Sequence, residues 1–253
     1  MKYSYEELAG MLDHSLLHPT LTDKELEEGC RLAAQYKVAS VCVKPYFVKR
    51  AAELLRGTGV KVGAVVAFPH GNSATEVKRF ETQVACRDGA VEIDMVINIG
   101  KALSGDWDYV EADIRAVCDE AHAHGAKVKV IFENDFLPDD AVKIRLCEVS
   151  ERAGADWVKT STGYGFVKGP DGQYSYRGAT EHDLRLMRAH VSSAVQVKAA
   201  GGVRDLDTLI KVRELGCTRC GATASAAMLE EYKKRAAGQS ASGGQASLGS
   251  GGY

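Results

Sequence analysis

The sequence predicts an α/β protein of the (β/α)8 TIM-barrel class, with parallel strands inside and helices outside. Short β-branched runs alternate with longer helical patterns, and eight such runs can be identified. This alternation implies parallel strands joined by crossover helices. Strand number and chain length favour a closed barrel, which typically takes ~250 residues, over an open doubly wound sheet. The first strand–helix unit also has no G-x-G-x-x-G turn, which counts against a dinucleotide-binding sheet.

The predicted strands are short and rich in Val, Ile and Thr, and the segments between them have helical periodicity. Several helical segments end in Gly just before the next strand, which is typical of a helix C-cap. The predicted strands are 13–17, 40–43, 62–68, 91–97, 127–133, 157–160, 195–199 and 219–223, and the predicted helices are 23–37, 73–87, 107–121, 138–153, 180–190, 205–215 and 224–235.

The chain is predicted to form one domain, residues 1–235, followed by a tail of different composition. Residues 236–253 are mostly Gly, Ser, Ala and Gln, with almost nothing to bury. Such a composition predicts a flexible segment.

Composition and charge exclude several function classes. Lys and Arg number 32 against 34 Asp and Glu, so no basic surplus indicates a nucleic-acid partner. No apolar run approaches the ~18 residues of a membrane span, and residues 1–10 lack the layout of a secretory signal. We therefore expect a cytoplasmic protein that binds neither nucleic acid nor membranes.

Seven cysteines, an odd number scattered through apolar segments, indicate a reducing compartment rather than a disulfide framework. Cys217 and Cys220 form a C-x-x-C with no second pair nearby. The pair is either a coincidence of core packing, which we expect, or a zinc or redox motif. We expect no bound metal.

Charged residues interrupt four strands that should be apolar in a doubly covered sheet. With a period of two, Glu92 and Asp94 share one face of their strand, and Lys129, Lys159 and Lys198 lie on the corresponding faces of theirs. The apolar faces must meet the helices, so the charged residues should project into the barrel. A structural salt-bridge network is one explanation. An active site is the other, because barrel enzymes keep catalysis at the C-terminal ends of the strands.

Two interior lysines suggest a specific chemistry. A free lysine has a pKa of ~10.4, so only about one in 2,500 is neutral at pH 7. A second ammonium ~4 Å away, at an effective dielectric constant of ~20, contributes about 4 kcal/mol towards lowering that pKa. The neutral amine can attack a carbonyl and form a Schiff base, whose imine is an electron sink for breaking a C–C bond. A nearby acid such as Asp94 could transfer protons directly or through water.

Glycine and hydroxyl residues follow three late strands, at 160–163, 201–202 and 221–223. Barrels often bind phosphate with the loops after strands 7 and 8, through backbone N–H groups. The three clusters together predict a phosphate site, although ordinary turns also need glycine.

These segments together resemble the deoxyribose-phosphate aldolase family. The resemblance covers nearly the whole predicted domain in order, and its most specific motifs are EIDMVINIG, VKTSTG and VKAAGGVR. The matching segments are LDHSLLHPT (12–20), VCVKP (41–45), VVAFPHG (65–71), EIDMVINIG (92–100), KVKVIFEN (127–134), DWVKTSTGYG (156–165), GAT (178–180), VKAAGGVRD (197–205) and CGATA (220–224).

The resemblance implies a class I aldolase, a lyase of deoxyribose phosphate catabolism that needs no cofactor. It would cleave 2-deoxy-D-ribose 5-phosphate reversibly to D-glyceraldehyde 3-phosphate and acetaldehyde. It implies Lys159 as the Schiff-base lysine, Lys198 as the lysine that perturbs it and Asp94 as the proton-handling acid. It implies substrate contacts by the residues Asp13, Cys42, Lys129, Gly163, Gly201, Gly202, Gly221 and Thr223. For Cys42 a small buried thiol is an equal alternative.

Other consequences of the resemblance concern partners and the tail. Family members are often homo-oligomers, dimers or tetramers, and some end in a Tyr thought to assist proton transfer. Tyr253 is similar, and a flexible tail of this length reaches roughly 23 Å, although it could also be idle. Departures from the family pattern at Lys44, His70, Asn134, Tyr164 and Ala224 should affect affinity or selectivity. Another Schiff-base sugar-phosphate aldolase, transaldolase-like, remains the alternative activity.

Overall fold

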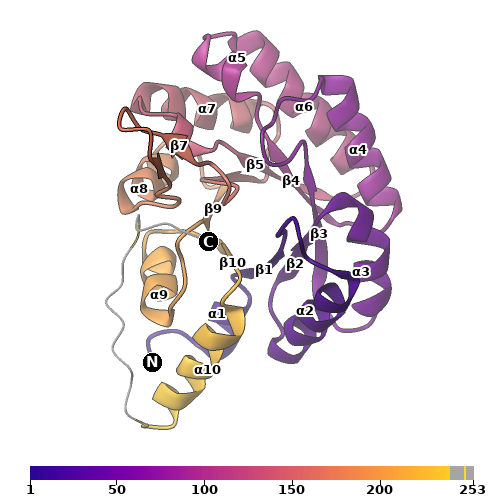
Figure 1. Ribbon diagram of the computed structural model, residues 1–253, viewed down its shortest axis with the longest axis vertical. Coiled ribbons are helices and arrows are strands. Elements are labelled where there is room, and N and C mark those ends of the chain that lie inside the picture. Colours follow the sequence, from indigo (N-terminus) through magenta and orange to yellow (C-terminus); the bar gives the residue numbers. More distant parts are fainter. Residues whose placement is uncertain (240–247, 249–253) are drawn as a thin grey trace.

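The computed structural model describes residues 1–239 and 248. Its centre is a closed, all-parallel barrel of eight strands, which confirms the predicted fold class (Figure 1). Around the barrel the strands follow the order β1-β10-β9-β6-β5-β4-β3-β2. Their bounds are β1 (Leu12–Leu16), β2 (Ser40–Val43), β3 (Lys61–Val66), β4 (Glu92–Val96), β5 (Lys127–Ile131), β6 (Trp157–Lys159), β9 (Gln196–Ala200) and β10 (Arg219–Ala222).

All eight predicted strands are present, and no strand end differs by more than two residues from the predicted one. The seven predicted helices also form, and Figure 1 shows helices packed around the outside of the barrel. They are α2 (Asp23–Tyr36), α4 (Thr75–Arg87), α6 (Trp107–Ala123), α7 (Asp140–Arg152), α8 (Glu181–Ala189), α9 (Leu206–Glu214) and α10 (Ser225–Ala236).

Several short elements were not predicted. They are α1 (Tyr5–Ala9), α3 (Val48–Leu54), α5 (Ile99–Leu103), the 3-10 turns η1 (Pro45–Phe47) and η2 (Asn134–Phe136), and a hairpin of β7 (Val167–Lys168) and β8 (Tyr174–Ser175). Elements of two to seven residues carry too few periodic positions to stand out in a sequence pattern. The hairpin lies between β6 and α8, yet β6 pairs directly with β9.

Side-chain caps explain where the helices begin. Thr22 accepts a hydrogen bond from the backbone N–H of Glu25, whose side chain accepts one from the backbone N–H of Thr22. This capping box satisfies two N–H groups that would otherwise lack partners. The Asp205 side chain likewise accepts a hydrogen bond from the backbone N–H of Thr208 at 2.8 Å, and it caps the N-terminus of α9.

The barrel strands carry buried side chains on both faces, with apolar residues facing the helices and charged residues facing the barrel interior. Ile93, Val128, Val158 and Val197 are fully buried in the hydrophobic core, which the helices also line. The side chains at alternate positions of the same strands point into the barrel. The apolar layer holds the helices to the barrel, and the interior is left for charged groups.

Apart from the single residue 248, the described part of the chain ends three residues after helix α10. Helix α10 ends at Ala236, one residue past the predicted domain boundary. The predicted flexible tail, residues 236–253, falls mostly outside the described residues, as does Tyr253. Across the described residues, no helix combines the length and apolarity needed to cross a bilayer.

Candidate active site

Seven charged side chains fill the barrel interior. Asp13, Asp94, Glu92, Lys129, Lys198, Lys159 and Arg219 are all at most 6% exposed. They come from β1, β4, β5, β6, β9 and β10. The period-two pattern predicted five of them on the inner face, namely Glu92, Asp94, Lys129, Lys159 and Lys198. Asp13 and Arg219 join them in the structure.

Asp94 lies at the centre of this network. Its Oδ2 accepts hydrogen bonds from Lys159 Nζ and Lys198 Nζ, both at 2.7 Å. Its Oδ1 accepts one from Lys129 Nζ at 2.9 Å. Because Lys159 and Lys198 are also register partners on adjacent strands, the two amines are crowded against the same carboxylate oxygen.

A second layer of charges lies below Asp94. Arg219 binds Glu92 through Nη2 at 2.7 Å and Asp13 through Nη1 at 2.6 Å. Lys129 also contacts Glu92 at 2.6 Å and Asp13 at 3.2 Å. The Trp157 ring lies within cation–π range of the Lys129 and Arg219 cations, at 5.8 and 5.2 Å from its centroid. The multiply bonded charges of this layer tie four strands together, and the Trp157 ring adds a fifth.

The charges do not balance when every group is ionised. Four cations, Lys129, Lys159, Lys198 and Arg219, face the three carboxylates Asp13, Glu92 and Asp94. A net positive charge in a buried interior is costly, and losing one proton removes it.

The structure indicates which lysine gives up that proton. Burial and the Lys198 ammonium lower the pKa of Lys159, against the opposing effect of Asp94. The pKa of Lys198 is raised, because Asp13 and Asp94 outweigh the effect of burial. Lys159 has a single carboxylate partner, whereas Lys198 has two, at 2.6 and 2.7 Å. Lys159 is therefore the amine that is most readily neutral.

A cavity opens above the two lysines at the C-terminal ends of the strands. It is lined by Lys159, Lys198, Asp13, Cys42, Thr162, Ser15, Leu17, Ala200, Gly201 and Gly221. The predicted residues Asp13 and Cys42 thus reach the cavity. Lys129 lies beneath the cavity, where it contacts carboxylates. Direct contact between Lys129 and a substrate therefore remains a prediction. Asp94 is also fully buried below the lysines.

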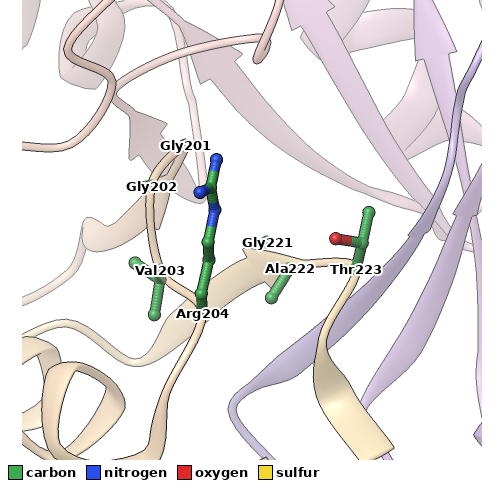
Figure 2. A pocket seen from close by; sticks show the side chains of 7 residues that line it. All are labelled: Gly201, Gly202, Val203, Arg204, Gly221, Ala222 and Thr223. Atoms are coloured by element: carbon green, nitrogen blue, oxygen red, sulfur yellow. The ribbon is translucent and has the colours of Figure 1, made fainter. Parts of the chain in front are cut away.

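A second pocket adjoins the first, since both are lined by Gly201 and Gly221 (Figure 2). It lies between the loops after β9 and β10, where the sequence predicted phosphate binding. Its lining residues are Gly201, Gly202, Val203, Arg204, Gly221, Ala222 and Thr223. Four of the five residues predicted to bind phosphate therefore line this pocket. The fifth, Gly163, is not among its lining residues, and the neighbouring Thr162 lines the adjoining cavity.

Backbone geometry suits this second pocket to an anion. Gly201 and Gly202 have φ angles of 89° and 81°, which other residues rarely adopt. A Cβ on Gly201 would lie 2.0 Å from the Tyr176 hydroxyl oxygen, so only glycine fits there. The pocket also lies just before the N-terminus of α10, where the helix dipole favours negative charge.

Sequence reasoning missed two contributors to the site, Arg204 and Arg219. Arg204 lines the second pocket and supplies a guanidinium group beside the glycine pair (Figure 2). Its position in VKAAGGVRD was the available signal. Arg219 completes the charged layer with Glu92, which the sequence had placed inside the barrel, but Arg219 opens a predicted strand and pairs with residues far away in sequence. Only the barrel closure reveals that pairing.

The departures from the family pattern lie around the mouth of the barrel. Tyr164 packs edge-on against Phe68, with ring centroids 5.5 Å apart, and both line an apolar cavity of about 270 Å³ with Leu17. Lys44 lines the same cavity and donates to the carbonyl of His18 at 2.8 Å. His70 is exposed, and Ala224 precedes α10 without a side-chain cap.

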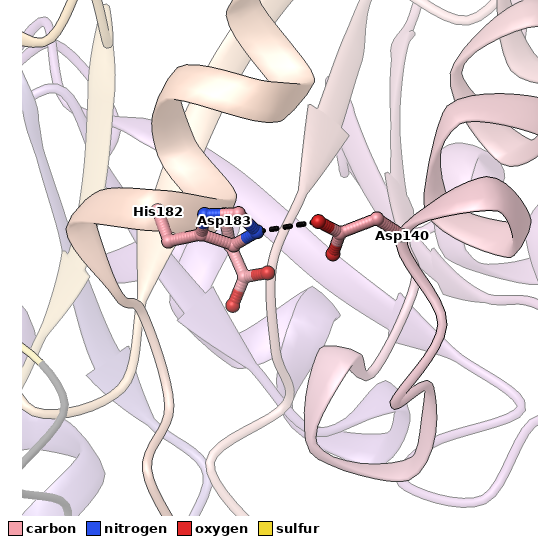
Figure 3. Close-up of side chains that lie close together, drawn as sticks. All are labelled: Asp140, His182 and Asp183. Carbon is pink, nitrogen blue, oxygen red and sulfur yellow. Dashed lines mark hydrogen bonds and ion pairs between the residues drawn. The ribbon is translucent and has the colours of Figure 1, made fainter.

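A separate cluster lies outside the barrel mouth, between α7 and α8 (Figure 3). His182 Nε2 is 2.6 Å from Asp140 Oδ2, and Asp183 is adjacent. Lys143 Nζ contacts Asp183 at 2.6 Å and Asp140 at 2.9 Å. The Lys143 ammonium already supplies the positive charge between these carboxylates. We therefore interpret the cluster as a structural link between the two helices.

The C-x-x-C motif lies in the core. Cys217 and Cys220 are both buried, and all seven cysteines are free thiols. Burial raises the pKa of the Cys217 thiol to about 12, which leaves almost no reactive thiolate at neutral pH. The geometry therefore favours core packing over a zinc or redox role.

Comparison with known proteins agrees with this geometry. The sequence profile of the DeoC/LacD family aldolases matches residues 8–230. A Rhodopirellula baltica protein named deoxyribose-phosphate aldolase is 52% identical over 233 residues, 92% of each chain. One from Aciduliprofundum boonei, with the same name, is 45% identical over 88% of this chain and 96% of the relative.

A solved structure shows the same arrangement. The deoxyribose phosphate aldolase of Aeropyrum pernix, described as having a unique tetrameric structure, superimposes with a TM-score of 0.81 at 30% identity. The match covers 92% of this chain and 93% of that one. By profile, sequence and structure, the chain belongs to the DeoC/LacD family of aldolases.

Proposed function

We propose that this aldolase cleaves 2-deoxy-D-ribose 5-phosphate reversibly, with Lys159 as the Schiff-base nucleophile. The observation that carries the proposal is the pair of amines, Lys159 and Lys198, that share Asp94 Oδ2 at 2.7 Å each. Crowding and burial keep Lys159 neutral enough to attack an aldehyde. The names of the curated relatives support the substrate.

The reaction follows from this arrangement. The Lys159 amine adds to the aldehyde carbon C1 and, after loss of water, forms a protonated imine. A base removes the proton of the C3 hydroxyl, the C2–C3 bond breaks, and its electron pair enters the imine to give an enamine. D-glyceraldehyde 3-phosphate leaves. The enamine then takes up a proton at carbon, and hydrolysis releases acetaldehyde and Lys159.

Asp94 and Lys198 handle protons in this scheme. Asp94 lies below the cavity and reaches it only through the two lysines or a water molecule. Lys198 keeps its proton, because its pKa is raised, and can donate a hydrogen bond to the oxygen that leaves C1. The imine serves as the electron sink, so no step in the proposal uses a metal or cofactor.

The second pocket would hold the phosphate. Backbone groups at Gly201, Gly202 and Gly221 line it, with the Thr223 hydroxyl and the Arg204 guanidinium. Guanidinium groups bind phosphate through charge-assisted hydrogen bonds. The pocket adjoins the Lys159 cavity through Gly201 and Gly221, which places the phosphate end and the reacting end of one substrate in one continuous space.

Borohydride trapping tests the nucleophile. With acetaldehyde and borohydride, the protein should gain one ethyl group, and peptide mapping should place it on Lys159. Lys159→Leu should lose both the adduct and the aldolase activity. Lys168→Leu, which removes an exposed lysine from the hairpin, is the matched control and should keep both. An active enzyme with unmodified Lys159 would refute the assignment.

Another Schiff-base aldolase would also trap acetaldehyde, so the substrate needs its own test. Glyceraldehyde 3-phosphate, which retro-aldol cleavage yields from both sugars, should be released faster from 2-deoxyribose 5-phosphate than from fructose 6-phosphate. A preference for a ketose phosphate would favour the transaldolase-like alternative. The tetrameric Aeropyrum pernix relative supports a homo-oligomeric state, which light scattering on the purified chain would measure.

A further inference from the structure

Glu133 is a buried carboxylate that the reaction scheme leaves unused. It lies two residues after the end of β5, is 1% exposed and has a positive φ angle of 60°. Backbone hydrogen bonds hold the residues on both sides of it to β6, from Phe132 N to Lys159 O and from Asn134 N to Thr160 O, both at 3.0 Å. A left-handed conformation at a non-glycine residue is costly and often marks a functional position.

The Glu133 carboxylate lies inside the loop that follows Lys159. The backbone N–H of Thr162 donates to its Oε1 at 3.1 Å, and the Thr162 hydroxyl donates to its Oε2. The same hydroxyl oxygen accepts a hydrogen bond from Tyr164 N at 2.9 Å. A Cβ on Gly165 would lie 2.7 Å from Glu133 Oε1, so a larger residue there would displace the Glu133 carboxylate.

This loop forms part of the wall of the active site. Thr162 lines the cavity that also contains Lys159 and Lys198. The carboxylate of Glu133 therefore sets the position of a cavity-lining residue three positions after the proposed nucleophile. A displacement of about 1 Å at such a position can lower the rate by roughly 100-fold.

The protonation state of Glu133 changes what the carboxyl group can hold. Burial raises its pKa to about 7, with a further rise from Asp135, while the hydrogen bonds from Thr162 and the charge of Lys159 lower it. The ionised carboxylate accepts both hydrogen bonds from Thr162. The neutral acid holds a proton on one oxygen, so it makes only neutral hydrogen bonds to Thr162, which are roughly half as strong as the charge-assisted ones.

We propose that Glu133 is a positioning residue for the aldol reaction, which holds Thr162 firmly in the cavity wall when ionised and only through weaker, neutral hydrogen bonds when protonated. This inference rests on the proposed function, because the rate in question is that of the Lys159 reaction. It deepens that function by adding a pH-sensitive group that touches neither substrate nor the reacting atoms.

Glu133→Gln provides the test. Glutamine keeps the size of the side chain and can accept from Thr162 N, but it cannot ionise. The measurement is kcat/KM for 2-deoxyribose 5-phosphate from pH 5.5 to 8.5, expressed as the ratio of wild type to variant. The ionisation of Lys159 affects both proteins and largely cancels in that ratio. We expect a ratio near one at pH 5.5 that rises to about tenfold at pH 8.5, since a charged hydrogen bond is lost only where Glu133 is ionised.

Two further variants separate positioning from general damage. In the Thr162→Val background, adding Glu133→Gln should have no further effect, because Glu133 acts through Thr162. Glu81→Gln is the matched control. The half-buried Glu81 carboxylate accepts a hydrogen bond at 2.7 Å from the backbone N–H of Ala67, the residue that follows β3. Burial also raises the pKa of Glu81. Its ratio to wild type should be near one at every pH.

The outcomes distinguish this inference from the proposed function. A ratio for Glu133→Gln that is the same at every pH, while Lys159 still traps acetaldehyde, would overturn the positioning role alone. Additive losses in the Thr162→Val cycle would do the same. Failure of the wild-type enzyme to trap acetaldehyde on Lys159 would remove the proposed function, and this inference with it.

Discussion

Lys159 and Lys198 donate to the same oxygen, Oδ2 of Asp94, each at 2.7 Å. Their two nitrogens are therefore separated by no more than twice that distance. Lys198 has a second carboxylate, Asp13, at 2.6 Å, whereas Lys159 has none. This asymmetry gives the two amines different tasks, because the better-paired lysine keeps its proton and the other can lose it.

Lys198→Leu should shift the activity of the enzyme to higher pH. The Lys198 ammonium lowers the pKa of Lys159, so its removal raises that pKa and leaves less free amine at neutral pH. Asp94 then also pairs more strongly with Lys159, which acts in the same direction. We expect kcat/KM at pH 7 to fall roughly 10–100-fold or more, with the acid limb displaced to higher pH. An unchanged pH–rate profile would contradict the role of the charge pair.

Asp94→Asn should shift the acid limb in the opposite direction. Asp94 raises the pKa of Lys159, so replacing its negative charge should lower that pKa. Trapping of acetaldehyde by borohydride should therefore persist at lower pH. The steady-state rate should still fall by about 100- to 10,000-fold, since a proton-transfer group is lost. Full retained turnover would exclude Asp94 from proton transfer.

Arg204→Ala should reduce selectivity for phosphorylated substrates. The guanidinium group lines the pocket beside Gly201 and Gly202, apart from the reacting lysine. We expect KM for 2-deoxyribose 5-phosphate to rise roughly tenfold or more, with little change for unphosphorylated 2-deoxyribose. Arg145→Ala, which removes an exposed arginine of α7, is the control. Equal losses on both substrates would mean that Arg204 does not bind phosphate.

Lys129→Met should destabilise the fold through its carboxylate partners. Lys129 is fully buried and lies within 3.2 Å of oxygens of Asp13, Glu92 and Asp94. Removing one partner of a buried charge network costs about 3–5 kcal/mol, because the remaining charges lose compensation. Urea unfolding would measure the change. Lys233→Met, at an exposed ion pair, should leave the midpoint almost unaltered. Similar effects of both substitutions would argue against the interior network.

Much of the site follows from local sequence patterns. Alternation along a strand assigns a side chain to one face, and this places Asp94, Lys159 and Lys198 inside a barrel without further information. The same pattern assigns Ile93, Val158 and Val197 to the helix-facing core, where the structure has them. The glycine pair after β9, Gly201 and Gly202, was likewise recognisable, because few residues other than glycine adopt its backbone angles.

Periodicity could not reveal contacts between distant strands. The register that sets Lys159 beside Lys198 depends on β6 pairing with β9 across a hairpin and a helix. The salt bridges from Arg219 to Asp13 and Glu92 form only because β10 and β1 close the ring. A strand pattern records which face a residue occupies and carries no information about its neighbour on the next strand.

The sequence by itself determined the barrel, its charged lining and the three residues with which the chemistry begins. The tertiary structure alone decided which lysine has one carboxylate and which has two, and that Glu133 lies inside the loop after Lys159. The physical reason is that charge balance and burial depend on distances between segments far apart in the chain. Those distances exist only once the sheet has closed on itself.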